Sequence, residues 1–209
     1  MSSPNADDHA APDARTLREA RAQYFVENDF GADGGYASPW VDFKLGKLPL
    51  PFPNTGSRVR AVRYHDLHHI LTGYRTDVPG EAEISAWELG GGCKNFAAAW
   101  LLNLSGLALG GVVAPRRTLR AFLRGRASRT LYGEDLETTL DRRVDEVRNE
   151  RMGVAAPPDA VGTGLFGLAF VAGATVGVGS FAVLAAMGPA LLVWGLVAPR
   201  WMARVVAAG

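Results

Sequence analysis

Forty consecutive residues without a charged side chain, from Ala160 to Pro199, constrain this chain more than any other feature of its sequence. A helix needs about 20 apolar residues to cross the hydrocarbon core of a bilayer, so the run has room for two crossings. The dipeptide Gly188-Pro189 interrupts it and marks a turn. We therefore predict a membrane-associated hydrophobic helical hairpin over residues 160–207, with one span near 161–187 and the second near 190–207.

Small residues follow one face of the first predicted span. Ala169, Gly173 and Gly177 recur at every fourth position, a pattern that lets a neighbouring helix approach closely. Arg200 and Arg204 lie just beyond the uncharged run and favour the cytoplasmic side of the membrane. We expect the chain to lie at the cytoplasmic face of a bacterial inner membrane, integral or tightly associated through the hairpin. A buried pair of hydrophobic helices is the alternative that the sequence leaves open.

The overall composition narrows the class of protein. The 209 residues include 22 Lys and Arg against 21 Asp and Glu, a balance that gives no electrostatic footprint for nucleic acid. The single cysteine, Cys93, excludes an internal disulfide framework and a cysteine-cluster metal site, and it fits a reducing, cytoplasm-facing location. Because residues 1–15 are polar, we expect no secretory signal there.

Hydrophobic periodicity predicts an all-α fold, a helical bundle over residues 15–156 with a metal site between two helices. Residues 1–14 are small, polar and acidic, and we expect a disordered tail there. The uncharged segment 95–114 is either buried in the bundle or dips into the membrane. The five arginines in residues 116–126 could bind lipid headgroups or form a solvated helix face. The predicted helices are 15–27, 57–71, 79–89, 95–114 and 133–151, with an extended, proline-containing connection over 28–54.

Side chains of the types that bind metals concentrate between residues 65 and 81. Three of the four histidines lie here, and His65 and His69 are one helical turn apart. Asp66 can swing toward the same point, or it could accept a hydrogen bond and orient a histidine. Glu81 begins the next predicted helix, where the helix dipole favours an ionised carboxylate. We predict His65, Asp66, His69 and Glu81 as metal ligands.

Two neighbouring residues have different expected roles. His68 points roughly opposite the other two histidines, and we expect it not to bind the metal. Glu88 lies two turns after Glu81 on the same helix face and is the reserve ligand. Imidazoles combined with carboxylates suit a divalent metal, with zinc as the first expectation and manganese, iron or cobalt as alternatives. Catalytic residues beyond the metal ligands are not identified by the sequence.

The spacing of the four predicted ligands resembles a family signature. The order His65-Asp66-x-x-His69, followed by eleven residues and Glu81, is similar to the motif of the coenzyme Q (ubiquinone) biosynthesis protein four family. Residues that flank the motif are also similar to that family, as is the later segment RGRASRTLYGEDLETTLDRRVDEVRNERMGV. The resemblance covers residues 58–153, and the hydrophobic hairpin departs from the family pattern.

The resemblance implies an all-helical domain that takes part in ubiquinone assembly and binds its metal through His65, Asp66, His69 and Glu81. It implies a metal-dependent lyase step that removes the carboxylate from ring carbon 1 of a polyprenylated hydroxybenzoate and introduces a hydroxyl. The implied partners are a polyprenylated aromatic lipid, other ubiquinone-biosynthesis enzymes and the membrane. Segment 95–114 would line the prenyl-tail site. A homo-oligomer is compatible with the sequence.

Two alternatives stay open at this point. The protein could be a non-catalytic, prenyl-lipid-binding membrane scaffold for the ubiquinone-biosynthesis enzymes, with a structural metal. It could also be a metal-dependent phosphohydrolase of the His-Asp type. Such phosphohydrolase sites draw further histidines from other helices, whereas the only histidine outside this window is His9.

Overall fold

The structure is a computed structural model that describes residues 13–41, 44–45, 48–49 and 52–179. Across these residues the fold is mostly helical, with eight helices and only four strands of two residues each, which confirms the predicted all-α class. Nearly all of the predicted tail over residues 1–14 and the whole second span near 190–207 lie outside the described residues.

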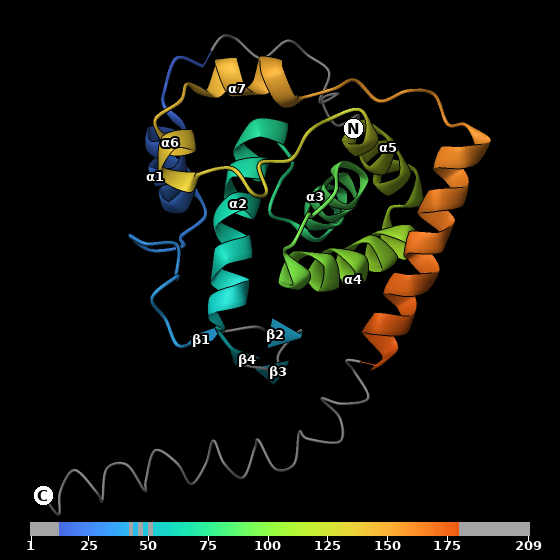
Figure 1. The fold of residues 1–209 in the computed structure, drawn as a ribbon. Coiled ribbons are helices and arrows are strands. Elements are labelled where there is room, and N and C mark those ends of the chain that lie inside the picture. Colours follow the sequence, from blue (N-terminus) through green and yellow to red (C-terminus); the bar gives the residue numbers. More distant parts are fainter. Residues whose placement is uncertain (1–12, 42–43, 46–47, 50–51, 180–209) are drawn as a thin grey trace, which may run out of the picture.

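Seven helices and two short strand pairs precede the long hydrophobic helix (Figure 1). The pairs are antiparallel, β1 with β4 and β2 with β3, and they lie within the connection that we predicted to be extended. The elements are α1 (Leu17–Glu27), β1 (Trp40–Val41), β2 (Lys44–Leu45), β3 (Leu48–Pro49), β4 (Phe52–Pro53), α2 (Gly56–Thr72), α3 (Val78–Gly91), α4 (Ala97–Val113), α5 (Pro115–Arg126), α6 (Leu136–Leu140) and α7 (Val144–Arg151).

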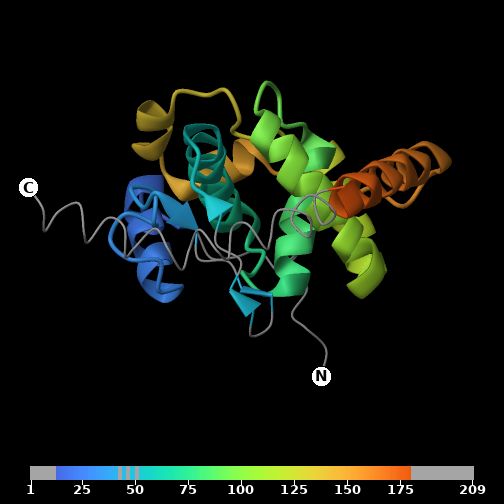
Figure 2. The ribbon, with the colours of Figure 1, turned by 90° about the horizontal axis from the view of Figure 1, so that it is seen from below.

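α3 lies at the centre of the fold and packs chiefly against α4 and α5 (Figure 1). α1 and α7 pack against α2, and α6 packs against α1. Seen from below, α1 lies at one end of the molecule and the Ala160–Gly179 helix at the other (Figure 2). The core between α2 and α3 is formed by fully buried side chains such as Leu67, Ile84 and Trp87. This packing fixes the two helices that carry the predicted metal ligands.

The predicted helix over residues 133–151 is wrong in one respect, because the structure divides it into α6 and α7. The backbone of Leu17 donates to Arg142 at 2.9 Å, and Val144 donates to Arg15, also at 2.9 Å. These bonds to the start of α1 hold Arg143 in an extended conformation, with φ −73° and ψ 142°. The helical pattern of hydrophobic residues is therefore interrupted by a contact more than a hundred residues away in the sequence.

The helix Ala160–Gly179 has the length and composition of a membrane span. Its 20 residues reach a mean hydropathy of 1.8 over the most apolar window, and only 11% of that window is buried by the rest of the protein. It covers the first part of the predicted span over 161–187. The remainder of that span and the predicted turn at Gly188-Pro189 lie outside the described residues.

Candidate metal centre

Two helices and the turn between them position the predicted ligands. α2 begins after Thr55, whose side chain accepts a hydrogen bond from the backbone of Arg58, and ends at Gly73 in the left-handed conformation. α3 begins after Asp77, whose carboxylate accepts a hydrogen bond from the Gly80 amide at 2.9 Å. A Cβ at Gly80 would collide with the Arg75 carbonyl. The turn can therefore close tightly enough to bring the first turn of α3 back to α2.

His65, His69 and Glu81 converge at this junction. The two Nε2 atoms lie 3.1 Å apart, and each lies 3.4 Å from an oxygen of Glu81. Two ligands bound at about 2.1 Å to a tetrahedral metal are separated by about 3.4 Å. One ligand atom from each of the three side chains can be chosen so that all three lie within 4.8 Å of one another. The three side chains therefore have the spacing of ligands to one metal ion.

Hydrogen bonds on the far side of each imidazole determine which nitrogen is free. Nδ1 of His69 lies 2.9 Å from the carbonyl oxygen of Tyr74, which can only accept, so this nitrogen carries the proton. Nδ1 of His65 lies 3.0 Å from the carboxylate of Glu88 and donates to it. Both Nε2 atoms consequently point toward each other and toward the Glu81 carboxylate, to which they hydrogen-bond in the metal-free protein. A divalent cation can take the place of the proton that His65 carries on Nε2, because both Nδ1 atoms keep their protons.

Glu88 is buried and holds the histidines in place by hydrogen bonds, but it does not belong to the group of His65, His69 and Glu81. Its Oε1 accepts from His65 at 3.0 Å and from His68 at 2.7 Å. Its Oε2 accepts from Asn103 and from the Tyr132 hydroxyl, at 2.5 and 2.7 Å. A carboxylate that orients a metal-binding histidine is a recurrent feature of metal sites. The predicted reserve ligand thus holds His65 in place instead of facing the candidate metal position.

His68 has its own structural role. It is fully buried, and its Nε2 accepts a hydrogen bond from the backbone amide of Leu131 at 2.8 Å, while Nδ1 donates to Glu88. Both ring nitrogens are therefore engaged in hydrogen bonds within the core, which agrees with the prediction that His68 does not bind the metal. Burial lowers the pKa of His68 and outweighs the bond to Glu88, so the ring is neutral.

The charges of the centre are strongly coupled. Burial by itself lowers the pKa of His65, but the carboxylates of Glu88 and Glu81 outweigh burial and raise it well above the usual value. Burial raises the pKa of Glu81, but hydrogen bonds from His65 and His69 outweigh burial and bring it to about 2. The pKa of Glu88 lies well below its usual value despite full burial, because the histidines stabilise its charge. Both carboxylates are therefore ionised at neutral pH.

Asp66, the fourth predicted ligand, is not brought into the converging group. Its side chain is buried and accepts a hydrogen bond from the hydroxyl of Tyr36 at 2.5 Å. Burial raises the pKa of Asp66. Tyr36 comes from the long connection before α2, and nothing in the spacing of the sequence linked it to Asp66. The sequence likewise contains no signal that the ring of Tyr24 stacks on His69, with the two ring centroids 5.8 Å apart.

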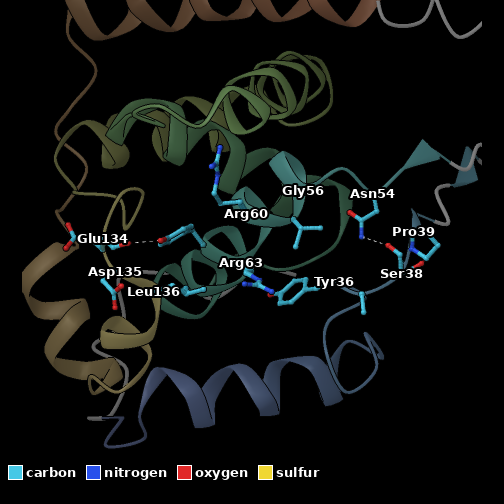
Figure 3. Close-up of a pocket in the computed structure, with 13 residues that line it drawn as sticks. Tyr36, Ser38, Pro39, Asn54, Gly56, Arg60, Arg63, Glu134, Asp135 and Leu136 are labelled. Carbon is cyan, nitrogen blue, oxygen red and sulfur yellow. Dashed lines mark hydrogen bonds between the residues drawn. The ribbon is translucent and has the colours of Figure 1, made fainter.

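The centre is open to solvent on one side. The side chain of Glu81 is 46% exposed and that of His65 is 20% exposed, whereas that of His69 is 1% exposed. A cleft of about 680 Å³ lies on the other side of Tyr36, between its loop, α2 and the start of α6 (Figure 3). In Figure 3 Arg63 lies beside Tyr36, over whose ring its guanidinium is placed at 5.3 Å. The helix that carries the histidines is therefore itself a wall of this cleft, and the hydrogen bond from Tyr36 to Asp66 ties the loop of Tyr36 to it.

Comparisons with protein-family models, with curated proteins and with solved structures find no match to this chain. The conclusions about the class of protein therefore depend on the fold and the site alone. They define an all-α protein with a His65–His69–Glu81 group that could hold a metal ion and one helix apolar enough to cross a membrane.

Proposed function

We propose that the protein is a metal-dependent enzyme of ubiquinone biosynthesis. In this proposal it replaces the carboxylate on ring carbon 1 of a polyprenylated hydroxybenzoate with a hydroxyl. The observation that carries the proposal is the convergence of two imidazole Nε2 atoms and one carboxylate at tetrahedral spacing. Three protein ligands leave a coordination position for a substrate, which is typical of catalytic rather than structural metal sites. The substrate class comes from the resemblance of the motif.

In this proposal each residue of the centre has a defined task. His65 and His69 would hold the metal through Nε2, and Glu81 would hold it through a carboxylate oxygen. Glu88 keeps the proton of His65 on Nδ1, so the other ring nitrogen stays available. When bound, the metal would supply Lewis-acid stabilisation of the charge that develops as carbon dioxide leaves. Replacing a ring carboxyl by a hydroxyl, with loss of carbon dioxide, is a two-electron oxidation. We propose that dioxygen takes up the two electrons and is reduced to hydrogen peroxide, with one water consumed for each carbon dioxide released.

The hydrophobic helix supports a substrate that stays in the bilayer. A polyprenylated aromatic compound partitions into lipid, so an enzyme acting on it has to work at the membrane surface. The Ala160–Gly179 helix is long and apolar enough to hold the protein there, with mean hydropathy 1.8 and little burial. We propose a location at the cytoplasmic face of the membrane, with the other ubiquinone-biosynthesis enzymes as partners.

The proposal is tested with the full chain reconstituted in lipid vesicles that contain a prenylated hydroxybenzoate. We expect the parent protein to release carbon dioxide and to form the hydroxylated ring, and we expect His65→Ala and Glu81→Ala to lose both products. Glu137→Ala is the matched control, because the side chain of this glutamate on α6 is 71% exposed and pairs with Arg18 at 3.0 Å instead of facing the centre. Unchanged turnover in both site variants would refute the proposal.

A non-catalytic scaffold with a structural metal is the second candidate. The burial of His69, with 1% exposure of its side chain and the ring of Tyr24 stacked on it, favours this role for the metal. In that case His69→Ala would lower the melting temperature and abolish partner binding. A normal melting temperature with intact partner binding in this variant would count against the scaffold.

A further inference from the structure

The outer face of α4 is an apolar surface that no other described element covers. With 100° between successive residues, the residues of α4 that face away from the other helices cover about 160° of the helix circumference. Leu101 and Leu109 are each 52% exposed and Val112 is 72% exposed. Ser105 is the one polar side chain on this face. An apolar surface that extends over a whole helix is typical of a protein or membrane contact.

The opposite face of α4 packs against α3 and α5 and is part of the folded domain. Asn103 is buried and donates to Glu88, the anchor of His65. A Cβ at Gly106 would collide with the side chain of Ser85 on α3. These contacts exclude a transmembrane arrangement of α4, because one side of the helix is committed to a folded domain with buried charges.

The apolar face continues onto the hydrophobic helix Ala160–Gly179. This helix crosses α4 through close contacts, since a Cβ at Gly173 would collide with the carbonyl of Leu104 and one at Gly111 with the ring of Phe170. On the side away from α4, Leu168 is 70% exposed and Val171 is 63% exposed. The two helices therefore present one joined apolar surface. Figure 1 shows the Ala160–Gly179 helix at the edge of the molecule farthest from α1, with the C-terminal part of α4 beside it.

Polar groups on this surface are satisfied within the protein. The hydroxyl of Ser105 donates to the carbonyl of Leu101 at 3.1 Å, and that of Thr175 donates to the carbonyl of Val171 at 2.9 Å. Beside this face, the indole N–H of the 39% exposed Trp100 donates to the carbonyl of Lys94 at 2.9 Å. Hydrocarbon offers no hydrogen-bond partners, so a lipid-facing helix has to bond its own polar side chains in this way.

Cationic residues lie at both ends of α4. Lys94, which is 52% exposed and lies 4.0 Å from Glu134, precedes the helix, and Arg116 and Arg120 follow it on the exposed side of α5. Within the described part of the chain, neither of these two arginines forms an ion pair, whereas Arg117 between them pairs with Glu83. Cations at both ends of a helix that is embedded on one side place both ends at headgroup level. This arrangement fits a helix that lies parallel to an anionic lipid surface.

We propose that α4 lies in one leaflet of an anionic bilayer, parallel to its surface, and forms a joined lipid-facing surface with the Ala160–Gly179 helix. Leu101, Leu109 and Val112 face the hydrocarbon, and Arg116 and Arg120 contact lipid phosphates. This proposal does not depend on the chemistry proposed for the metal centre.

The test measures the surroundings of single labelled positions in the full chain. An environment-sensitive fluorophore is attached to Leu109→Cys, to Val171→Cys as the lipid-facing reference and to Glu137→Cys as the aqueous reference. Cys93 is fully buried, so the parent chain controls for background labelling. The protein is reconstituted in vesicles of phosphatidylcholine and phosphatidylglycerol in equal parts. We expect a blue-shifted emission and quenching by lipid-borne nitroxides at Leu109→Cys and Val171→Cys, and neither effect at Glu137→Cys.

Two results would overturn the membrane contact of α4. A label at Leu109→Cys that is as accessible to aqueous iodide as the label at Glu137→Cys would place α4 in water. A label there that is protected from iodide and also from lipid-borne nitroxides would mean that protein covers α4, either residues 180–209 or a second copy of the chain.

The headgroup contact has a separate test. In the mixed vesicles, Arg116→Glu combined with Arg120→Glu should reduce nitroxide quenching at Leu109→Cys, because the reversed charges are repelled by phosphatidylglycerol. The control Arg129→Glu, on an arginine that is 67% exposed, should leave the quenching unchanged. Equal quenching with and without the charge reversal at Arg116 and Arg120 would refute the phosphate contact.

Discussion

Replacement of Glu88 tests the geometry of the metal centre most sharply. Its two oxygens accept from His65 and His68 on one side and from Asn103 and Tyr132 on the other. The variant Glu88→Gln keeps the shape of the side chain and one oxygen for the two histidines, but it removes the charge. The new amide NH₂ group then faces a tyrosine hydroxyl and an asparagine amide, and both of these groups can turn to accept its hydrogens.

We expect Glu88→Gln to weaken metal binding more than it changes the free energy of unfolding. Loss of the carboxylate behind a metal-binding histidine weakens metal binding by about 10–100-fold, or about 1.4–2.7 kcal/mol. Four hydrogen bonds each lose about 1 kcal/mol of charge assistance, but the desolvation penalty of a buried carboxylate, several kcal/mol, disappears with the charge. We therefore expect the free energy of unfolding of the metal-free Glu88→Gln variant to stay within about 2 kcal/mol of the parent value.

The assay is a competition titration of metal-free protein with zinc and a chromophoric chelator, with thermal unfolding as the check on folding. Glu83→Gln is the matched control, because Glu83 is also buried on α3 but pairs with Arg117 and does not contact the centre. We expect this control to bind zinc like the parent. An unchanged zinc affinity in folded Glu88→Gln would refute the inference that Glu88 holds His65 for the metal.

Three further predictions concern the same centre. Asp66→Asn should keep one bound metal per chain, because Asp66 lies outside the converging group, and metal analysis showing its loss would contradict the geometry. A chelator should lower the melting temperature of the metal-loaded protein by about 5–11 °C, since a ligand at 100 times its Kd stabilises by about 2.7 kcal/mol, and His69→Ala should not respond. Zinc affinity should rise about tenfold per pH unit while the proton on His65 is being displaced. Because the pKa of His65 is raised, protonation competes with zinc below that value, and the rise should continue above the usual histidine range; an affinity that is flat between about pH 6 and 8 would contradict this.

The helices were predictable where the local pattern and the caps agree. For α2, Thr55 caps the N-terminus and Gly73 caps the C-terminus, and the predicted range 57–71 is within one residue of the structure at both ends. The divided helix α6–α7 was not predictable from its own residues. Its hydrophobic stripe is continuous, and the interruption comes from hydrogen bonds between Arg142, Val144 and the start of α1. A sequence pattern reports local periodicity and does not include such distant backbone partners.

In the metal centre, too, one feature was predictable from the sequence and another was not. The pairing of His65 with His69 follows from the helical repeat, which places residues four positions apart on one face. The sequence did not determine whether Asp66 binds the metal, because its side chain lies 100° around the helix from His65 and can turn toward the metal position or away from it. The hydroxyl of Tyr36, from the connection before α2, decided this by binding the Asp66 carboxylate.

The sequence by itself determined the all-α class, the helix that carries both histidines and a segment able to cross a membrane, because each depends on neighbouring residues. The sequence also predicted Glu81 as a ligand, but tertiary structure alone decided that Asp66 lies outside the group and that Glu88 orients His65. It also decided that the free face of α4 joins the hydrophobic helix. These outcomes depend on how the α2–α3 turn closes and on how α3, α4 and the Ala160–Gly179 helix pack. Such packing is a balance of contacts between segments far apart in the chain, which local periodicity does not encode.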